Sequence, residues 1–139
     1  MIHDTPQLPI TAQVRQVIDD LDRLRPQIEA ALEYADGTHN FDDVVVMVMQ
    51  GKLRMWAMPN SVMLTEIVDF PRERHYHMFL GGGDLEEILA MHPQVEKAAL
   101  DAGCVKLSVT GRRGWVKALL PHGWEEKHTT VHKTLNRGQ

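Results

Sequence analysis

Four of the eight histidines occur in pairs whose spacing could serve metal chemistry. His75 and His77 share one face of an expected strand, and His128 and His132 share a face if the last segment is extended. Two such pairs could meet across a sheet as ligands of a zinc ion. The spacing matches no zinc motif and no cysteine is available beside them. Solvated or hydrogen-bonded histidines are therefore the preferred interpretation, and no metal is expected.

Two other side chains are of types that catalyse proton transfer or nucleophilic attack. Glu66 lies near the middle of an expected strand and could act as general base for an amine if it faced a cleft. Val62, Leu64 and Val68 share its parity, so a face partly open to solvent is preferred for it. Cys104 is the only cysteine, which excludes an intrachain disulfide and indicates a reducing compartment. A thiol at a strand start is usually buried and inert.

A basic cluster around a tryptophan is a candidate partner surface, consisting of Arg112, Arg113, Trp115 and Lys117. Arg and Trp are enriched at protein interfaces, where planar side chains bury large area. A short helix capped by Thr110, with Trp115 in the core, would explain the same residues without a partner.

The elements that must position these side chains begin with three helices. An amphipathic helix is expected over residues 11–24, and a second runs from Pro26 in its first turn to a stop at Gly37. A third helix is expected over residues 41–49. Its valines favour a strand, but Asn40 can cap it and carboxylates occupy its first turn.

Strands dominate the middle of the chain. Residues 53–58 and 62–70 have the two-residue period of a hairpin with a Pro-Asn turn, and residues 75–80 form a third strand. Asp84 then caps a helix, with Glu87 in the position of a capping-box partner.

Proline and glycine punctuate the last part of the chain. Pro93 is expected to break the helix near Met91-His92 and to open a second one. A strand over residues 105–109, a short basic helix, a turn at residues 121–124 and a final strand follow. Helices around a mixed sheet predict an α/β (α+β) domain.

Length and charge restrict the class of protein. The 139 residues, 43% hydrophobic, suit a single domain over residues 11–139 behind a flexible arm at residues 1–10. A net charge of −4 and a pI near 6.0 give no sign of binding to nucleic acid. The longest apolar run, residues 44–49, is far below the ~20 residues of a membrane span, and no signal-peptide pattern occurs.

The order of elements and several motifs resemble the GNAT N-acetyltransferase fold. A helix leading into Ala-Gly-Cys-Val-Lys-Leu-Ser-Val (102–109) and another leading into His-Gly-Trp (122–124) are similar to its C-terminal half. Residues 31–44, 53–88 and 102–124 look like the small GNAT-like proteins of tailed bacteriophages and prophages. The resemblance implies a mixed, mostly antiparallel central sheet flanked by helices. It also implies a virion-associated protein, similar in fold to an internal virion protein of podoviruses.

In active GNAT enzymes a loop written Arg/Gln-x-x-Gly-x-Gly/Ala holds the diphosphate of acetyl-CoA at a helix N-terminus. The candidate cofactor-binding residues at the corresponding place are Phe79, Leu80, Gly81, Gly82 and Gly83. The Arg/Gln is absent, and Asp84, Glu86 and Glu87 bring like charge to the position of the diphosphate. A glycine turn before a well-capped helix is the preferred interpretation, and no cofactor is expected.

The proton donor of the family is missing as well. GNAT enzymes commonly reprotonate the departing thiolate with a Tyr four residues before the Gly of the closing turn. Counting back from Gly123 gives Leu119, which cannot donate a proton. Tyr34 and Tyr76 lie elsewhere in the pattern, and neither takes over the role.

Two hypotheses follow. The preferred one is a catalytically degenerate GNAT-fold protein of a bacteriophage that acts through contacts with other virion proteins, in one or more copies, in the virion and the host cytoplasm. The alternative is an active acyl-CoA-dependent N-acetyltransferase with a non-standard cofactor loop and acetyl-CoA as its cofactor.

Overall fold

A computed structural model describes residues 10–111 and 113–136 of the chain. It contains a four-stranded sheet in the order β1-β2-β3-β4, formed by Arg54–Ala57, Val62–Asp69, Arg74–Gly82 and Lys106–Val109. The first three strands are antiparallel, and β4 is parallel to β3. The mixed, mostly antiparallel sheet that the sequence predicted is confirmed.

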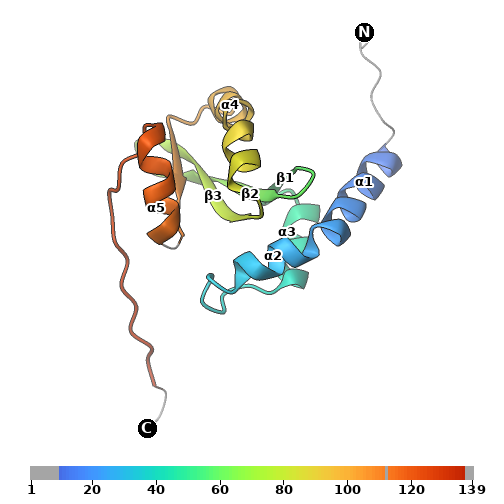
Figure 1. Ribbon diagram of the computed structural model, residues 1–139, viewed down its shortest axis with the longest axis horizontal. Helices are drawn as coiled ribbons and strands as arrows, with labels where there is room; N and C mark the ends of the chain where they lie inside the picture. The colour runs from blue at the N-terminus through green and yellow to red at the C-terminus, as the bar shows by residue number, and fades with distance from the viewer. Residues whose placement is uncertain (1–9, 112, 137–139) are drawn as a thin grey trace.

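Helices cover both faces of this sheet (Figure 1). On one face lie α1 (Ile10–Arg23), α2 (Arg25–Leu32) and α3 (Phe41–Met49), and on the other lie α4 (Leu85–Asp101) and α5 (Arg113–Leu119). Each side has its own apolar cluster. The cluster under α1–α3 includes Leu24, Ile28 and Leu64, and the cluster under α4 includes Met63, Met78 and Val95. Among the described residues no helix combines the length and apolar character that a membrane span requires.

The N-terminal helices agree with the sequence prediction. The side chain of Asn40 accepts a hydrogen bond from the N–H of Asp43, and the Asp43 carboxylate accepts one from the N–H of Asn40, both at 2.9 Å. This capping box decides between helix and strand for the valine-rich α3. Gly37 adopts a positive φ of 79°, but α2 has already ended at Leu32. The predicted arm lies outside the described residues, except for Ile10 at the start of α1.

The break predicted at Pro93 is wrong, because α4 is one continuous helix. Four of its side chains are buried at helical spacing: Ile88, His92, Val95 and Ala99. Pro93 itself is exposed on the other side. Proline in a helix interior costs about 3 kcal/mol. Burial of a stripe on both sides of the proline offsets that cost.

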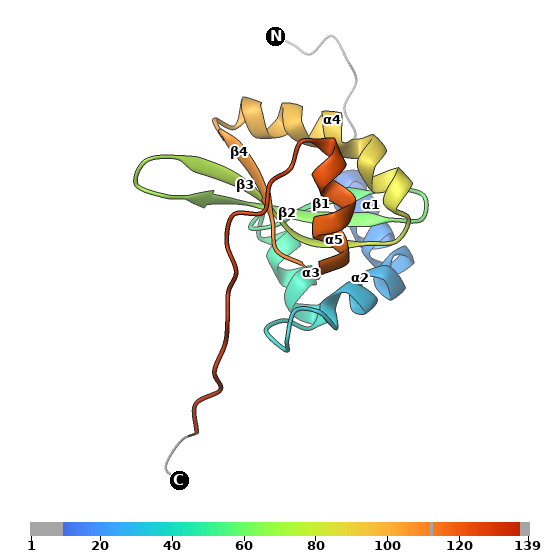
Figure 2. The same ribbon diagram turned by 60° about the vertical axis from the view of Figure 1, so that its left-hand side comes forward.

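The final strand predicted after residue 124 is also wrong. Residues 125–136 are exposed and have no regular secondary structure. They follow a short 3₁₀ turn, η1 (Leu120–His122), and run away from the domain in two views (Figure 1 and Figure 2). A strand needs a neighbouring strand for its main-chain hydrogen bonds, and this segment has none among the described residues.

Candidate functional site

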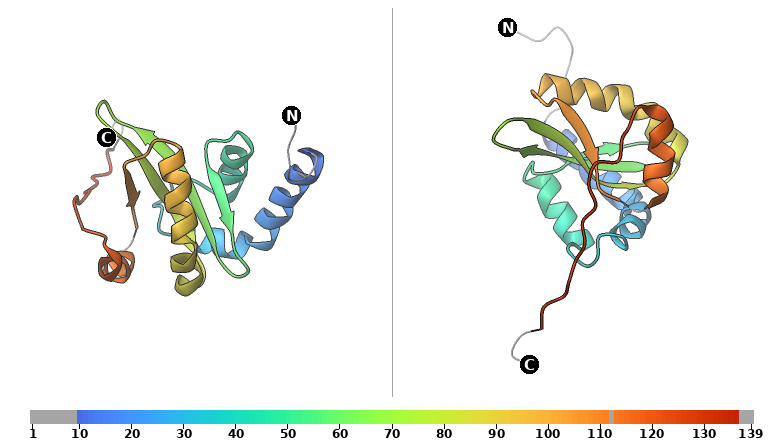
Figure 3. Two further views of the ribbon diagram at one scale, coloured as in Figure 1. Left: turned by 90° about the horizontal axis from the view of Figure 1, so that it is seen from above. Right: turned by 90° about the vertical axis from the view of Figure 1, so that its left-hand side faces the viewer.

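The split between β3 and β4 is the candidate functional site. The two strands pair only from His75↔Lys106 to Met78↔Val109. Beyond that point β3 continues to Gly82 beside β2, while the chain after Val109 turns away toward α5. The strands are seen to diverge in Figure 3.

A register shift in β3 lies at this split. Leu64 pairs with Leu80 but Thr65 pairs with Met78, so Phe79 has no register partner in β2. Because one extra residue reverses the two faces of a strand, Leu80 faces the cluster under α1–α3 while Met78 faces the cluster under α4.

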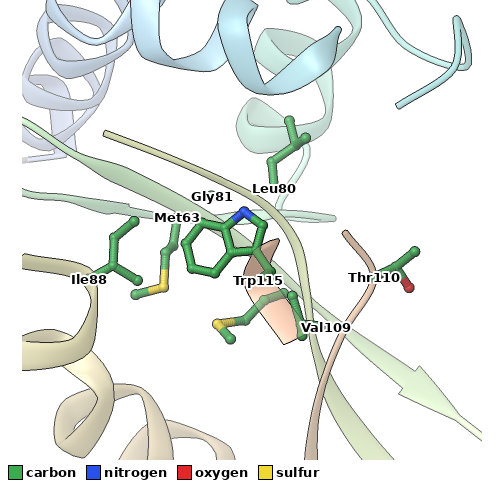
Figure 4. A pocket seen from close by; sticks show the side chains of 8 residues that line it. Met63, Leu80, Gly81, Ile88, Val109, Thr110 and Trp115 are labelled. Carbon is green, nitrogen blue, oxygen red and sulfur yellow. The ribbon is translucent and has the colours of Figure 1, made fainter. Parts of the chain in front are cut away.

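Trp115 fills the split (Figure 4). Its indole ring lies among Met63, Met78, Ile88 and Val109, on the side of the sheet that α4 covers. A cavity of about 20 Å³ remains beside the ring. This is room for about one water molecule, and a pantetheine chain could not enter while the ring of Trp115 stays in this position.

Gly81 faces the same ring. A side-chain carbon at Gly81 would lie 3.4 Å from the indole of Trp115, which is ordinary van der Waals contact. A methyl group at Gly81 would therefore fit against the indole, and the close packing of the ring does not require glycine here.

At Gly82 and Gly83, main-chain atoms of other segments lie where a side chain would begin. A side-chain carbon at Gly82 would lie 2.6 Å from the carbonyl oxygen of Gln27 in α2, and one at Gly83 would lie 2.7 Å from Cα of Ser61. Gly83 also has a φ of +112°, which L side chains rarely adopt. These glycines allow β3 to pack closely on α2 and on the β1–β2 turn.

The N-terminus of α4 is occupied by the protein's own carboxylates. Asp84 caps the helix by accepting the N–H of Glu86 at 2.9 Å. Glu87 does not complete the predicted capping box. Its carboxylate accepts the N–H of Asn60 at 3.0 Å and the hydroxyl of Ser61 at 2.7 Å. The hydrogen bond from Ser61 holds the pKa of Glu87 below its usual range.

Glu66 lies on the sheet face opposite to Trp115, directly across from His77 on β3. His77 is in register with Ser108 on β4, and its Nδ1 and the Ser108 Oγ share a hydrogen bond of 2.9 Å. Burial lowers the pKa of His77, although the charge of Glu66 opposes the shift. The row Glu66–His77–Ser108 ends one residue before the strands part. The partnership with Ser108 follows from the β3–β4 register, which the sequence pattern does not reveal.

The two histidine pairs do not come together. His75 contacts Glu73 at 3.4 Å, whereas His132 on the exposed C-terminal segment lies 3.8 Å from Asp36. Among residues 10–111 and 113–136 no group of three His, Cys, Asp or Glu side chains is placed to hold a metal ion.

The basic cluster is divided by the helix. Trp115 points inward, while Arg113 and Lys117 of α5 are exposed, and Arg112 lies outside the described residues. Leu119, in the position of the family's proton donor, is 1% exposed. Cys104 is buried, and burial raises the pKa of its thiol. Tyr76 is buried in the cluster under α4, and Tyr34 is exposed.

A groove that sequence reasoning missed lies between β1 and the C-terminal half of α4. It measures about 560 Å³ and is lined by Arg54, Trp56, Lys97 and Asp101, among others. The guanidinium of Arg54 stacks 4.0 Å from the ring centroid of Trp56. Arg54 and Trp56 are two residues apart in a strand and therefore share one face of the sheet. This spacing was the signal in the sequence that could have indicated the groove.

No family model matches the chain, and no curated protein matches it either. Several solved structures do match the chain. A probable acetyltransferase superposes with a TM-score of 0.61 at 10% identity, covering 87% of this chain and 94% of its own. A Trypanosoma brucei acetyltransferase gives 0.54 at 12% identity, with 68% and 78% covered. An aminoglycoside acetyltransferase from an uncultured soil metagenomic sample, solved with sisomicin, gives 0.55 at 13% identity, with 85% and 91% covered. The chain therefore has the GNAT acetyltransferase fold.

Proposed function

We propose that this GNAT-fold chain works through contacts with other proteins, with its acyl-CoA slot closed. The observation that carries the proposal is the indole of Trp115 in the split between β3 and β4, which leaves a cavity of only about 20 Å³. A fold is compatible with many functions, so the function has to be argued from this site.

The N-terminus of α4 supports the same proposal. Only Gly83 and Asp84 separate β3 from α4, and the Asp84 N–H donates to the Ser61 Oγ at 2.7 Å. Glu86 and the ionised Glu87 stand in the first turn of the helix. A diphosphate placed there would be repelled by these carboxylates. The N–H groups of Asp84 and Glu86, which could otherwise bind it, already donate to Ser61 and to the Asp84 carboxylate.

The partner class comes from the sequence resemblance, which predicts other virion proteins of a tailed bacteriophage. The exposed Arg113 and Lys117 on α5 are the proposed contact residues. Arginine is enriched among the interface residues whose truncation weakens binding most. Co-purification of the chain with phage particles tests this, with the double variant Arg113→Ala/Lys117→Ala expected to fold normally and to be lost from the particles.

Calorimetric titration with acetyl-CoA tests the closed slot. No binding is expected for the native chain. The variant Trp115→Ala should open space in the split without creating a diphosphate site, so it should bind no better than weakly. A dissociation constant in the low micromolar range for the native chain would contradict the proposal.

An N-acetyltransferase is the second candidate, and one observation favours it. The row Glu66–His77–Ser108 lies beside the split, where an acyl group would be transferred, and burial keeps His77 neutral so that it can accept a proton. In such a reaction the amine nitrogen would form a bond to the acyl carbon while the bond between the acyl carbon and the sulfur breaks. His77 would take the ammonium proton, and solvent would reprotonate the thiolate.

The solved acetyltransferases of similar fold also favour this candidate. Sisomicin, the ligand of one of them, is a suitable first acceptor. Release of free thiol from acetyl-CoA in its presence would support an enzyme, provided that His77→Ala abolishes the release and His128→Ala, at an exposed histidine, does not. Absence of thiol release with sisomicin and with a set of small polyamines counts against it.

A further inference from the structure

The groove between β1 and the C-terminal half of α4 lies at the other end of the strand order from β4. Its volume of about 560 Å³ is in the range of sites that bind a small molecule or a few residues of a peptide. Ala98 and Ala102 line it on the α4 side, and their short side chains leave this space open. Neither function proposed above makes use of the groove.

Arg54 is held in position on the β1 wall of the groove. Its guanidinium lies 4.0 Å from the ring centroid of Trp56, the geometry of a cation–π contact. The ring of Trp56 is fixed in turn, because it is buried and its Nε1 donates to the Thr65 Oγ1 at 3.0 Å. The guanidinium is therefore oriented before any ligand arrives, which lowers the entropic cost of binding one.

A second arginine stacked on a ring shows what Arg54 lacks. The guanidinium of Arg25 lies 4.4 Å from the ring centroid of Phe41, and its Nε pairs with the Glu29 carboxylate at 3.4 Å. No carboxylate of residues 10–111 and 113–136 lies within ion-pair distance of Arg54. An arginine has five N–H donors in a planar fork that matches the two oxygens of a carboxylate. At the groove this fork is left for a carboxylate from outside.

The charges of the lining favour a ligand with one negative charge. Arg54 and Lys97 are cations and Asp101 is an anion, so the lining has a positive excess in a chain whose net charge is −4. Lys97 pairs with Asp101 at 3.0 Å, but both side chains are largely exposed. Such exposed pairs contribute little to stability, so Lys97 can turn to a ligand at small cost.

A carboxylate on a peptide fits these features best. A phosphate group would bring a charge of about −1.5 to −2, and Asp101 would repel the excess. The exposed walls would cover too little of a small free acid, whereas a peptide gains contacts along its length. The methyl groups of Ala98 and Ala102 are suited to contact an apolar side chain beside the acidic one.

We propose that the groove binds a peptide segment of a partner protein in which an acidic residue stands beside an apolar one. The acidic carboxylate binds the guanidinium of Arg54, and Lys97 donates to it from the α4 wall. The apolar side chain lies over Ala98 and Ala102. Arginine and tryptophan are the residue types enriched at the centres of such contacts. The groove works whether or not the split admits acyl-CoA, so this site is separate from the function proposed above.

A nuclear magnetic resonance titration of the full chain with the acetylated and amidated peptide Ala-Leu-Glu-Leu-Ala tests the site. The signals of the Trp56 indole N–H and of the Ala98 amide should shift and saturate. A dissociation constant in the millimolar range is expected, because a short free peptide loses conformational freedom on binding. The matched peptide with Gln in place of Glu should bind about tenfold more weakly. Unchanged signals with the acidic peptide, or equal affinity for both peptides, would overturn the proposal.

Two arginine variants separate the groove from a general effect of charge. Arg54→Gln should lower the affinity for the acidic peptide about tenfold. Arg25→Gln removes the same charge from the arginine that is stacked on Phe41 and should leave the affinity unchanged. Lys97→Ala, at an exposed position, provides the test if Arg54→Gln does not fold, and should weaken binding about two- to fivefold. Equal losses in the two arginine variants, or full affinity in Lys97→Ala, would contradict binding at this groove.

Two further probes test the chemical class of the ligand. Sodium propionate, a free acid, should bind much more weakly than the acidic peptide, since it makes none of the contacts along the groove. Equal affinity for propionate would assign the groove to small acids and overturn the peptide. The same peptide with phosphoserine in place of Glu should bind no more tightly, because Asp101 repels the additional charge. Tighter binding of the phosphopeptide would overturn the assignment of a carboxylate.

Discussion

The N-terminus of α4 and the helix α5 both close the region where β3 and β4 part, but by different means. At α4 the closure is made of main chain: Gly82 and Gly83 pack on α2 and on the β1–β2 turn, and Glu87 is bonded to that turn. At α5 a single side chain, Trp115, occupies the space. The first closure can be opened only by unfolding the turn. The second depends on one helix of seven residues.

The largest effect is expected from Gly83→Ala. The new methyl group would overlap the carbonyl oxygen of Asn60 and lie 2.7 Å from Cα of Ser61, at a φ of +112°. The free energy of unfolding, measured by chemical denaturation, should fall by about 3–5 kcal/mol.

Gly103→Ala is the matched control for Gly83→Ala. Gly103 also has a positive φ, +84°, but no atom lies within 4 Å of the position of a new methyl group. It should lose only about 1–2 kcal/mol. Equal losses for the two variants would mean that the close approach to the β1–β2 turn is unimportant.

Trp115→Ala should have the next largest effect. The ring packs on the cluster under α4 but is partly exposed, so we expect a loss of about 2–4 kcal/mol in the free energy of unfolding. Lys117→Ala, two residues along the same helix and exposed, should change stability by no more than about 0.5 kcal/mol. If the tryptophan variant is as stable as the lysine variant, the side chain does not hold α5 in place.

Ser61→Ala probes the hydrogen bonds of the main-chain closure. The Ser61 hydroxyl is fully buried, accepts the Asp84 N–H and donates to Glu87, each at 2.7 Å. Its removal should cost about 1–3 kcal/mol, because the Asp84 N–H loses its acceptor. Thr130→Ala, in the exposed C-terminal segment, is a control that should leave the free energy of unfolding unchanged. An equally small effect of Ser61→Ala would show that the Ser61 hydroxyl does not stabilise the turn.

The smallest effect concerns pH. Burial lowers the pKa of His92, while the charge of Glu96 opposes the shift and that of His122 adds to it. Above the ordinary imidazole value of about 6.5 both folded and unfolded chains carry a neutral side chain. As the pH falls below about 6.5, the unfolded chain takes up a proton at this histidine before the folded chain does. The free energy of unfolding should therefore decrease as the pH is lowered.

Denaturation measured at several pH values should show this loss in the native chain and a smaller one in His92→Met. Burial lowers the pKa of His77 too, so a residual slope is expected in that variant. His128→Met, at an exposed position, should keep the full slope. A slope unchanged by His92→Met would remove His92 as its source.

Much of the fold follows from local signals in the sequence. The caps of α3 and α4, the hairpin of β1 and β2, and the amphipathic α1 depend on residues within a few positions of one another, so their patterns can be interpreted without knowledge of the rest. Pro93 was misjudged because burial of residues on both sides of it, an effect of the whole domain, outweighs a local rule.

The sequence by itself determined which residue types stand at the site: three glycines, three carboxylates after them, a leucine in the place of the proton donor, and Trp115 in the segment that follows β4. Only the tertiary structure decided what they do. That Gly82 meets Gln27, that Trp115 enters the split and that His77 meets Ser108 depends on the β2–β3 register shift and on the parallel pairing of β4. These contacts join residues far apart in the chain, and a shift of one residue in register would turn each strand side chain to the other face.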